Sequence, residues 1–230
     1  MRPMTLLELA GAPPPVPARF GEAVVVVIDA QREYVDGAIP LPGVTAALDE
    51  IGRLLARARA QRTPVIHIVH HAKAGKVFAP GSPGVEIMAP AAPAPGEPVL
   101  TKSLPNAFAS TDLADRLHAL HRSAIIVVGF MTHMCVEATS RAAIDLGLRA
   151  TVIAAATATR DLPDPLTGAT VPAAEVQRNA LAALADRFAT VAASQDAIAE
   201  KGTPSRRCAE IATPPPLTSH RAGRPRADRS

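Results

Sequence analysis

Three side chains of the types that perform covalent chemistry follow apolar segments of this 230-residue sequence. Asp29 comes directly after the run Ala23–Ile28, Lys102 closely follows a second apolar stretch, and Cys135 lies a short turn beyond a third. A carboxylate, an ammonium group and a thiol can act as a general base, a stabilising cation and a nucleophile. The sequence therefore predicts nucleophilic catalysis, provided that the fold brings the three side chains together.

Each of these residues also has an ordinary structural explanation. A lone cysteine is commonly a small buried hydrophobic residue, Asp29 could cap a turn or a helix, and Lys102 could be exposed to solvent. Cys135 stands at the expected start of a helix, where backbone N–H groups favour an anion and lower the pKa of a thiol. An unpaired Asp29 carboxylate at the end of an apolar strand would be costly, which favours the catalytic interpretation.

The elements that must position these residues alternate between strands and helices. Apolar runs without polar alternation are typical of strands buried on both faces of a parallel sheet. The expected strands are Ala23–Ile28, Val65–Val69, Val99–Leu100, Ala124–Val128, Thr151–Ala155 and Thr190–Ala193. The expected helices cover 44–62, 113–120, 135–148 and 172–188. This order predicts a doubly wound α/β domain with a parallel sheet and right-handed crossovers.

Ligands of open α/β sheets bind at the carboxyl ends of the strands, so the residues after each strand are candidates for the site. Most of the few aromatic residues lie in these connections, which suggests a pocket. The candidate substrate-binding residues are Gln31, Tyr34, Phe108, Phe130 and His133. Phe130 could instead be a core residue, and His133 could be structural. The Pro- and Gly-rich stretch 70–98 is long for a loop and is typical of a lid or a binding loop.

The net charge of +3 is unevenly distributed along the chain. Residues 201–230 hold seven basic and two acidic residues, and the other 200 residues hold 17 basic and 19 acidic residues. We therefore expect an N-terminal arm at 1–19, one domain at 20–200, and a basic, Pro-rich, disordered tail at 201–230. Because the positive charge belongs to the tail, a nucleic-acid partner is not expected.

Composition excludes several other classes of protein. Hydrophobic residues make up 48% of the chain, which excludes a wholly disordered protein, and two cysteines exclude a disulfide scaffold. The longest apolar runs are far shorter than a membrane span. The N-terminus lacks a long apolar segment, so a secretory signal is not expected. We expect a cytoplasmic protein with no membrane partner, in which Cys208 is a bystander.

The phosphate-binding and serine-hydrolase motifs are absent from the sequence. It contains no G-x-G-x-x-G after the first expected strand, no G-x-x-x-x-G-K-[ST] and no G-x-S-x-G. We therefore expect no nucleotide or other cofactor.

Three segments, in order, resemble those of the isochorismatase-like cysteine hydrolases, a family that includes nicotinamidases, carbamoyl-amide hydrolases and isochorismatases. The segments are "VVVVIDAQREYVDG", "PVLTKSLPNAFASTDL" and "IIVVGFMTHMCVEATSRAAIDLGLRATVIAAATATRD". The resemblance covers roughly residues 20–195, and the third segment is the most specific. It implies a three-layer αβα Rossmann-like domain with about six parallel strands, and a homo-oligomer.

The resemblance also implies roles for individual residues. Asp29, Lys102 and Cys135 match the catalytic triad of the family. A cis peptide bond that is not before proline is expected between Phe130 and Met131, and the amides of Met131 and Cys135 match the oxyanion hole. The expected reaction is hydrolysis of a C–N bond in a small amide or carbamoyl substrate through a thioester, with Lys102 and the helix N-terminus lowering the pKa of the thiol.

Two departures from the family narrow the prediction. Nicotinamidases bind a metal through an Asp and histidines after the second strand, where this sequence has His67, His70 and His71 without a D-x-H pattern. Adjacent histidines on an extended chain point in opposite directions, so no metal site is expected, although one of His70 and His71 could line the site. Isochorismatases resemble the family but lack the cysteine, so vinyl-ether hydrolysis is the alternative reaction. A non-catalytic binding or assembly role is the third possibility.

Overall fold

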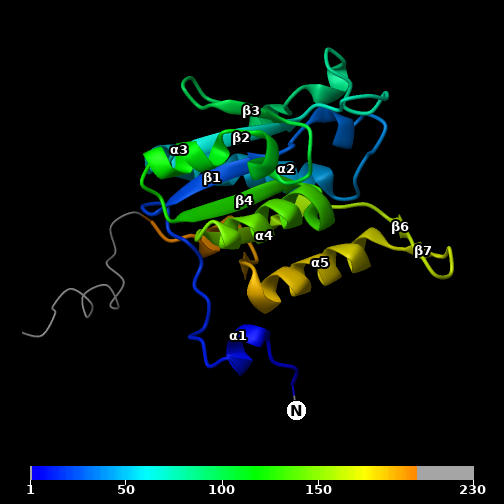
Figure 1. Cartoon of the computed structure of the whole chain (residues 1–230). Helices are drawn as coiled ribbons and strands as arrows, with labels where there is room; N and C mark the ends of the chain where they lie inside the picture. The colour runs from blue at the N-terminus through cyan, green and yellow to red at the C-terminus, as the bar shows by residue number, and fades with distance from the viewer. Residues whose placement is uncertain (1, 201–230) are drawn as a thin grey trace, which may run out of the picture.

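A computed structural model describes residues 2–200 of the chain. Its centre is a six-stranded sheet in the order β3-β2-β1-β4-β5-β8, in which all neighbouring strands are parallel (Figure 1). The strands are β1 (Ala23–Ile28), β2 (Val65–His70), β3 (Val99–Lys102), β4 (Ala124–Phe130), β5 (Arg149–Ala158) and β8 (Thr190–Ala192). Each of the six predicted strands is present, so the parallel α/β sheet is confirmed.

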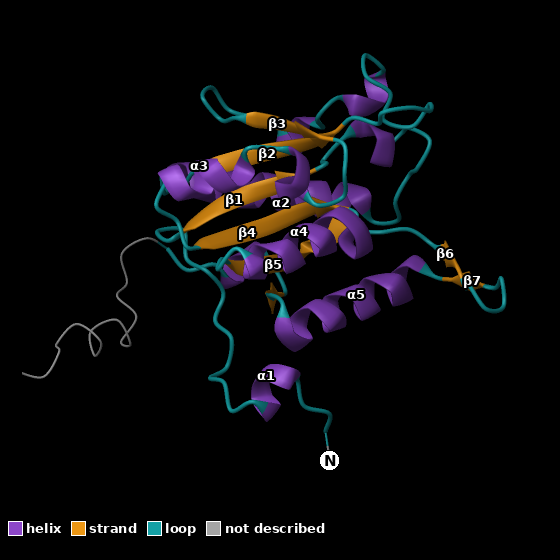
Figure 2. Ribbon diagram, viewed as in Figure 1, coloured by secondary structure: helices purple, strands orange, loops and turns teal. Residues whose placement is uncertain are grey.

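Helices cover both faces of the sheet and complete the three layers (Figure 2). One face packs against α2 (Val44–Ala60), whose buried residues recur at helical spacing and include Ile51, Leu54 and Leu55. The other face packs against α3 (Leu113–Ala119), α4 (Glu137–Asp145) and α5 (Ala173–Arg187). The three-layer αβα architecture implied by the resemblance is therefore present.

The central strand β1 is apolar throughout because each of its faces is covered. Val25 and Val27 belong to the core beneath α2, and Val24, Val26 and Ile28 belong to the core on the opposite face. The chain leaves β1 toward β2 on one side, and β4 lies on the other, so the strand order reverses here. A crevice at the carboxyl ends of β1 and β4 is therefore the expected ligand site.

Several features of the fold were not predicted. β5 is longer than expected, and its pairing with β4 shifts register between Val127 and Gly129. A short hairpin, β6 (Leu162–Pro163) with β7 (Thr170–Val171), projects between β5 and α5 (Figure 1). The N-terminal arm contains a single helical turn, α1 (Leu6–Leu9), in which the N–H of Leu6 donates to Asp186 at the end of α5.

The stretch predicted as a lid or binding loop is tied to the segment that follows β1. It contains two 3₁₀ turns, η2 (Pro83–Val85) and η3 (Ala89–Ala91). The N–H of Arg32 donates to the carbonyl of Glu86 at 2.9 Å, and the N–H of Met88 donates to the carbonyl of Ala30 at 2.9 Å. The loop therefore helps to hold the chain immediately after Asp29.

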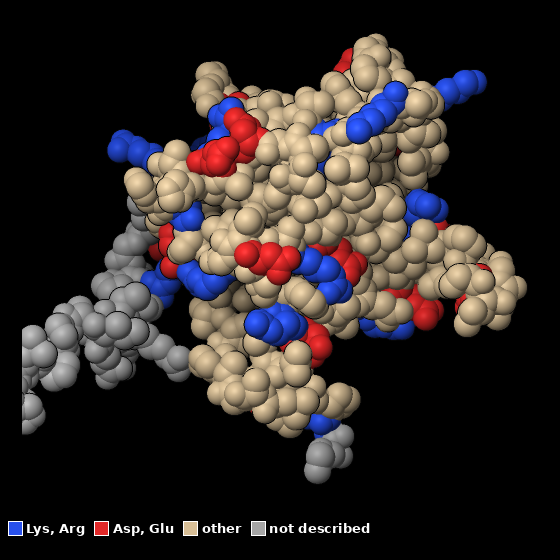
Figure 3. Space-filling model, in the orientation of Figure 1, with Lys and Arg blue, Asp and Glu red and all other residues tan. Residues whose placement is uncertain are grey.

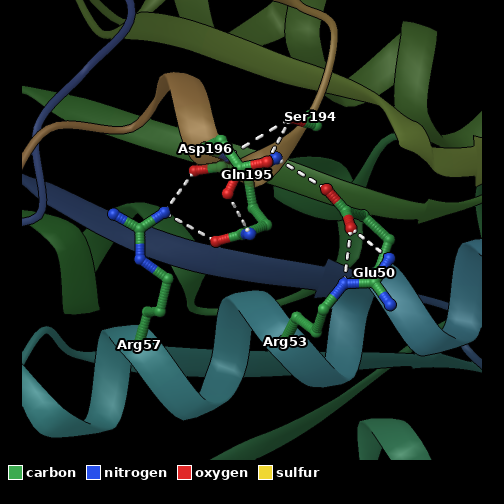
Figure 4. Close-up of polar contacts among 6 residues, drawn as sticks. All are labelled: Glu50, Arg53, Arg57, Ser194, Gln195 and Asp196. Carbon is green, nitrogen blue, oxygen red and sulfur yellow. Dashed lines mark hydrogen bonds and ion pairs between the residues drawn. The ribbon is translucent and has the colours of Figure 1, made fainter.

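A buried polar cluster fastens the end of the described chain to α2 (Figure 4). Glu50 is 4% exposed and accepts the N–H of Gln195 at 2.7 Å. Arg57, two turns along the same helix, donates to the main-chain and side-chain oxygens of Gln195, both at 2.6 Å. The N–H of Phe20 donates to the carbonyl of Ala199 at 3.2 Å, which joins the two ends of the segment 20–200. The tail 201–230, with Cys208, lies outside the described residues.

Basic and acidic side chains are interspersed on the face that carries α3, α4 and α5 (Figure 3). Several of them form ion pairs one helical turn apart, including Asp112 with Arg116 at 2.9 Å and Glu137 with Arg141 at 2.6 Å. This face therefore carries no broad patch of a single charge.

Gly129 lets β4 approach β1 closely beside the expected site. Its φ is +110°, and a Cβ atom added there would lie 1.9 Å from the carbonyl oxygen of Ile28. We expect Gly129→Ala to lower the free energy of unfolding by about 3 kcal/mol or more, because both the backbone angle and the contact are unfavourable. The control is Gly147→Ala, where φ is +73° and no atom lies within 4 Å. Similar losses for the two variants in urea unfolding would contradict the steric explanation.

Candidate active site

Asp29 is the first residue after β1, and its side chain is completely buried. Its φ is +49°, a left-handed conformation that Asp and Asn tolerate better than other residues with a side chain. The backbone is fixed on both sides, because the N–H of Asp29 donates to Ile68 at 2.9 Å and its carbonyl accepts from Gln31 at 2.7 Å. The carboxylate is therefore held at the carboxyl end of the central strand.

Lys102 ends β3 and is 1% exposed. Its Nζ lies 2.6 Å from Oδ2 of Asp29, so two strands separated by β2 contribute a buried ion pair. Burial raises the pKa of the Asp29 carboxyl, and the positive charge of Lys102 opposes that rise. A buried charge without a partner would be costly. Asp29 and Lys102 can both be charged because each is the counter-charge of the other.

Cys135 lies in a π-helical turn, η5 (Thr132–Val136), that leads directly into α4. Its side chain faces the ion pair, with Lys102 Nζ 3.3 Å from Sγ, and the residue is 4% exposed. The peptide bond between Phe130 and Met131 is cis, as the resemblance implied. The carbonyl of Met131 accepts the N–H groups of Met134 at 3.1 Å and Val136 at 3.2 Å, which fixes the turn. The structure thus brings the three predicted side chains together.

The expectation of a lowered thiol pKa is wrong for the resting site. The pKa of the Cys135 thiol is raised to about 12, first because the thiol is buried and then because the nearby Asp29 carboxylate is negative. The positive charge of Lys102 opposes these effects without overcoming them. The site therefore holds a carboxylate, an ammonium group and a neutral thiol, and a thiolate has to be generated by a base.

The side chain of Gln31, a predicted substrate-binding residue, is committed to hydrogen bonds with the backbone. Gln31 is completely buried. Its amide nitrogen donates to the carbonyls of His70 at 3.1 Å and Val85 at 3.0 Å, and its oxygen accepts the N–H of His70 at 2.8 Å. The residue joins the end of β2 to the loop that covers it.

Tyr34 and Phe130 belong to a buried aromatic cluster with Phe78. The ring of Tyr34 lies edge-on to Phe78 at 5.0 Å and to Phe130 at 5.8 Å between centroids. Phe130 is completely buried in the core under α2, which is the alternative that the sequence left open for it. The pKa of Tyr34 is raised first by burial and then by the nearby Asp29 carboxylate. Tyr34 therefore remains a candidate for the floor of the site.

The remaining two substrate-binding candidates lie at the margin of the site. Phe108 is half-buried and packs against the core on the side of α3 and α4. His133 is half-buried in the same helical turn as Cys135, and its Nδ1 makes a hydrogen bond with Oγ1 of Thr159. That bond occupies one ring nitrogen of His133 in joining η5 to the end of β5.

The two histidines of β2 make different contacts. His67 is 1% exposed, and its Nε2 lies 2.9 Å from a carboxylate oxygen of Glu97. His70 points the other way, and its Nδ1 lies 3.2 Å from Lys102 Nζ. Among residues 2–200, no group of three or more His, Cys, Asp or Glu side chains is arranged to hold a metal ion. The Nδ1 lone pair of His70 accepts a hydrogen bond from the Lys102 ammonium group, so it is not free to bind a metal.

The sequence left open whether His70 or His71 reaches the site, and the structure selects His70. The available signal was the strand pairing, since His70 lies beside Lys102 in the register of β2 with β3. Strand order, which places β2 between the strands that end at Asp29 and Lys102, could not be read from the sequence alone.

The three triad-like side chains are almost closed off from solvent. Grooves of about 630, 560 and 350 Å³ lie elsewhere, and none of these three is lined by Asp29, Lys102 or Cys135. His70, which contacts Lys102, and His133, two residues before Cys135, retain some exposure. The thiol of Cys135 is therefore largely shielded from solvent. Within residues 2–200, no helix is long and apolar enough to cross a membrane.

The raised thiol pKa predicts a distinctive alkylation profile. A Cys208→Ser background leaves Cys135 as the only thiol in the chain. We expect its reaction with iodoacetamide to be slow near about pH 7 and to accelerate through about pH 10 without a plateau, because only the thiolate reacts. Asp29→Asn removes a negative charge and should accelerate alkylation near neutral pH. A plateau in the profile of the unaltered site below about pH 8 would contradict the raised pKa.

Comparison with known proteins identifies the family. Residues 23–196 match the isochorismatase domain. The chain belongs to the isochorismatase family. Its sequence is 36% identical over 184 residues to the secreted isochorismatase effector Isc1 of Verticillium dahliae. The matched residues cover 80% of this chain and 94% of that protein. The resemblance inferred from the three sequence segments is thereby confirmed.

Two further relatives in the isochorismatase family are named as hydrolases. A streptothricin hydrolase of Streptomyces noursei is 39% identical over 168 residues, which cover 73% of this chain and 61% of that protein. The maleamate amidohydrolase of Pseudomonas putida is 32% identical over 152 residues, which cover 58% of this chain and 71% of that protein. These names are consistent with a hydrolase.

A solved structure supports the same family assignment. The isochorismatase structure from Pseudomonas putida has a TM-score of 0.80 and 38% identity, and the match covers 86% of this chain and all of that one. The six-stranded parallel sheet and its flanking helices are therefore the isochorismatase-like fold.

Proposed function

We propose that this isochorismatase-family protein is a cysteine hydrolase that cleaves the C–N bond of a small amide or carbamoyl compound. The observation that carries the proposal is a single buried ammonium group, Lys102 Nζ, that lies 2.6 Å from Asp29 Oδ2 and 3.3 Å from Cys135 Sγ. A base, a cation and a nucleophile within contact distance form the arrangement that covalent catalysis requires.

The first half-reaction transfers the acyl group to Cys135. Because the thiol is neutral at rest, Asp29 accepts its proton as the sulfur attacks the carbonyl carbon of the substrate. Lys102 stays charged and stabilises the negative charge that moves from Asp29 to the sulfur. The thiolate therefore exists only while the carbonyl is being attacked.

The negative charge then passes to the carbonyl oxygen of a tetrahedral intermediate. We assign its stabilisation to the backbone amides of Met131 and Cys135, at the first turn of the helix that continues into α4. Removing one oxyanion donor typically slows catalysis by about 10²–10³-fold. Protonated Asp29 returns its proton to the leaving nitrogen, the C–N bond breaks, and ammonia or an amine departs.

The second half-reaction restores the enzyme. Water attacks the thioester carbonyl and loses a proton to Asp29, and the second tetrahedral intermediate expels Cys135 as a thiolate. That thiolate regains a proton from Asp29, which returns the site to a neutral thiol beside an ion pair. Each residue ends the cycle in its initial protonation state, so no cofactor is required.

The enclosed position of the site supports a small substrate. Cys135 is 4% exposed, and Tyr34, our candidate for the floor beside it, is 2% exposed. The amide class is supported by the name of the maleamate amidohydrolase relative. These two observations favour a compact amide over a peptide.

The second candidate is vinyl-ether hydrolysis of isochorismate, favoured by the names of the Isc1 relative and of the Pseudomonas putida structure. That reaction uses acid catalysis and needs no thiol. A non-catalytic binding or assembly role is the third candidate. Isochorismate turnover that survives Cys135→Ala would support the second candidate, and an inert pocket would support the third.

The test is a panel of small primary amides and carbamoyl compounds, incubated with the full-length protein and assayed for released ammonia. We expect turnover of at least one member that disappears in Cys135→Ala. Ammonia release by both proteins at the same rate would overturn the proposed mechanism.

Other properties of the chain are part of the same proposal. We assign the catalytic unit to 20–200, with an arm at 1–19 and a tail at 201–230 that take no part in the chemistry. A homo-oligomer and a cytoplasmic location stay predictions, and the Isc1 relative is named as a secreted protein. Size-exclusion chromatography and cell fractionation are the corresponding measurements.

A further inference from the structure

His70 contacts the candidate triad but has no role in the mechanism described above. It ends β2, directly between the strands that carry Asp29 and Lys102. Its Nδ1 lies 3.2 Å from Lys102 Nζ, and the two residues are paired in the register of β2 with β3. The side chain is half-buried.

Two hydrogen bonds and one ion pair surround the Lys102 ammonium group. An ammonium group carries three N–H donors and no acceptor. Nζ lies 2.6 Å from Asp29 Oδ2, 3.3 Å from Cys135 Sγ and 3.2 Å from His70 Nδ1. The ammonium group therefore has three partners, and His70 is the one that takes no part in the proposed chemistry.

We propose that His70 is a positioning residue that holds the Lys102 ammonium group between Asp29 and Cys135. This inference rests on the proposed function, since Lys102 matters only if Asp29 and Cys135 exchange a proton. A flexible lysine without a third acceptor could swing toward Asp29 alone. His70 keeps the cation where it also stabilises the developing thiolate.

The proposed contact requires a neutral imidazole. The titratable groups beside His70 are Lys102 from β3 and the adjacent His71. Burial, Lys102 and His71, in that order, lower the pKa of His70 to about 4. With Nδ1 accepting from Lys102, the ring proton resides on Nε2, which makes no hydrogen bond to another residue of the segment 2–200.

The orientation of the imidazole is itself supported. The side-chain amide of Gln31 makes two hydrogen bonds with the backbone of His70. Its oxygen accepts the N–H of His70 at 2.8 Å, and its nitrogen donates to the carbonyl of His70 at 3.1 Å. The ring of Phe78 lies edge-on to the imidazole, with centroids 5.3 Å apart at 80°. These contacts explain the burial of Gln31, which sequence analysis assigned to substrate binding.

The test compares three variants of His70 that differ in where an acceptor remains. Asn places its side-chain oxygen near the position of Nδ1, Gln places its amide near the position of Nε2, and Leu offers no acceptor. His71→Leu is the matched control, because His71 is the adjacent histidine and makes no side-chain hydrogen bond within the described residues. All variants are made in the full-length chain, and urea unfolding checks that each one folds.

The proposal predicts a pattern in kcat. We expect His70→Leu and His70→Gln to lower kcat by about 10- to 100-fold, with KM changed little, since a misplaced catalytic group affects the transition state more than binding. His70→Asn should recover most of kcat, and His71→Leu should leave it unchanged. Equal rates for His70→Asn and His70→Gln, or an effect confined to KM, would overturn the proposal.

A second readout does not depend on turnover. In the Cys208→Ser background, a displaced Lys102 stabilises the thiolate less, so His70→Leu should slow alkylation of Cys135 at alkaline pH and His70→Asn should not. If the amide panel fails but this pattern holds, the positioning role stands while the proposed function falls. If Cys135→Ala abolishes turnover but no His70 variant changes alkylation or kcat, the proposed function stands and the positioning role of His70 falls.

A third readout tests the neutral imidazole. The pKa of His70 in the folded protein is about 4, below its ordinary value of 6.5. The contribution of the neutral imidazole to stability is therefore present above pH 6.5 and is lost as the pH falls from 6.5 to about 4. The urea midpoint of the unaltered protein should therefore fall more steeply between these pH values than that of His70→Asn. Identical slopes would contradict the assignment of a neutral ring.

Discussion

Replacement of Cys135 by alanine is expected to lower the rate of amide hydrolysis by about 10⁴-fold or more, because the acyl group loses the atom to which it is transferred. The substitution removes one buried sulfur atom from a site whose backbone is fixed by Met131, so the fold should persist. The measurement is ammonia release from the best substrate of the panel, with urea unfolding as the check on folding.

The chain supplies a matched control for this variant. Cys208→Ala removes the only other cysteine of the sequence and should leave the rate unchanged. Loss of activity in both variants, or in neither, would show that the thiol of Cys135 does not perform the chemistry.

Replacement of Asp29 by asparagine is expected to lower kcat/KM by about 10³-fold, within the range that a general base contributes. Asn tolerates the left-handed backbone at this position and keeps the side-chain volume, so lost activity reports on the proton acceptor. The variant also leaves Lys102 buried without a counter-charge, which should cost about 3–5 kcal/mol of folding free energy. The measurements are kcat/KM and the urea midpoint.

A double variant separates the two consequences of losing Asp29. In Asp29→Asn with Lys102→Met, both charges are absent and an unbranched apolar side chain fills the space of Lys102. Removing both members of a buried ion pair is often close to neutral for stability. We therefore expect the double variant to regain stability without regaining activity. Recovery of activity together with stability would mean that Asp29 acts through folding and not as a base.

The fold was largely predictable from the sequence because the sheet is covered on both faces. β1 and β4 are apolar throughout, and continuous Val and Ile runs indicate strands of that kind. The helices between them were visible in the spacing of their apolar residues. Asp29, Lys102 and Cys135 were found by the same logic, since each lies at or just beyond the carboxyl end of a strand.

The unpredicted features depend on contacts between distant segments. The register shift arises in the pairing of β5 with β4 between Val127 and Gly129, and the hydrogen bond of α1 joins Leu6 to Asp186, 180 residues away. The structural role of Gln31 required the loop after β2 to lie over β1. The raised pKa of Cys135 required the depth of burial to exceed the influence of Lys102. None of these quantities is encoded in local spacing.

The central claim, that an acyl group is carried on Cys135, is tested most directly by partitioning between two nucleophiles. An amide and its N-methyl counterpart share an acyl group but differ in the leaving group. With added hydroxylamine, a common thioester would give the same ratio of hydroxamate to free acid from both substrates, whatever their relative rates of turnover. The proposed mechanism predicts identical ratios, and ratios that differ with the leaving group would show that water attacks the amide without an intermediate on Cys135.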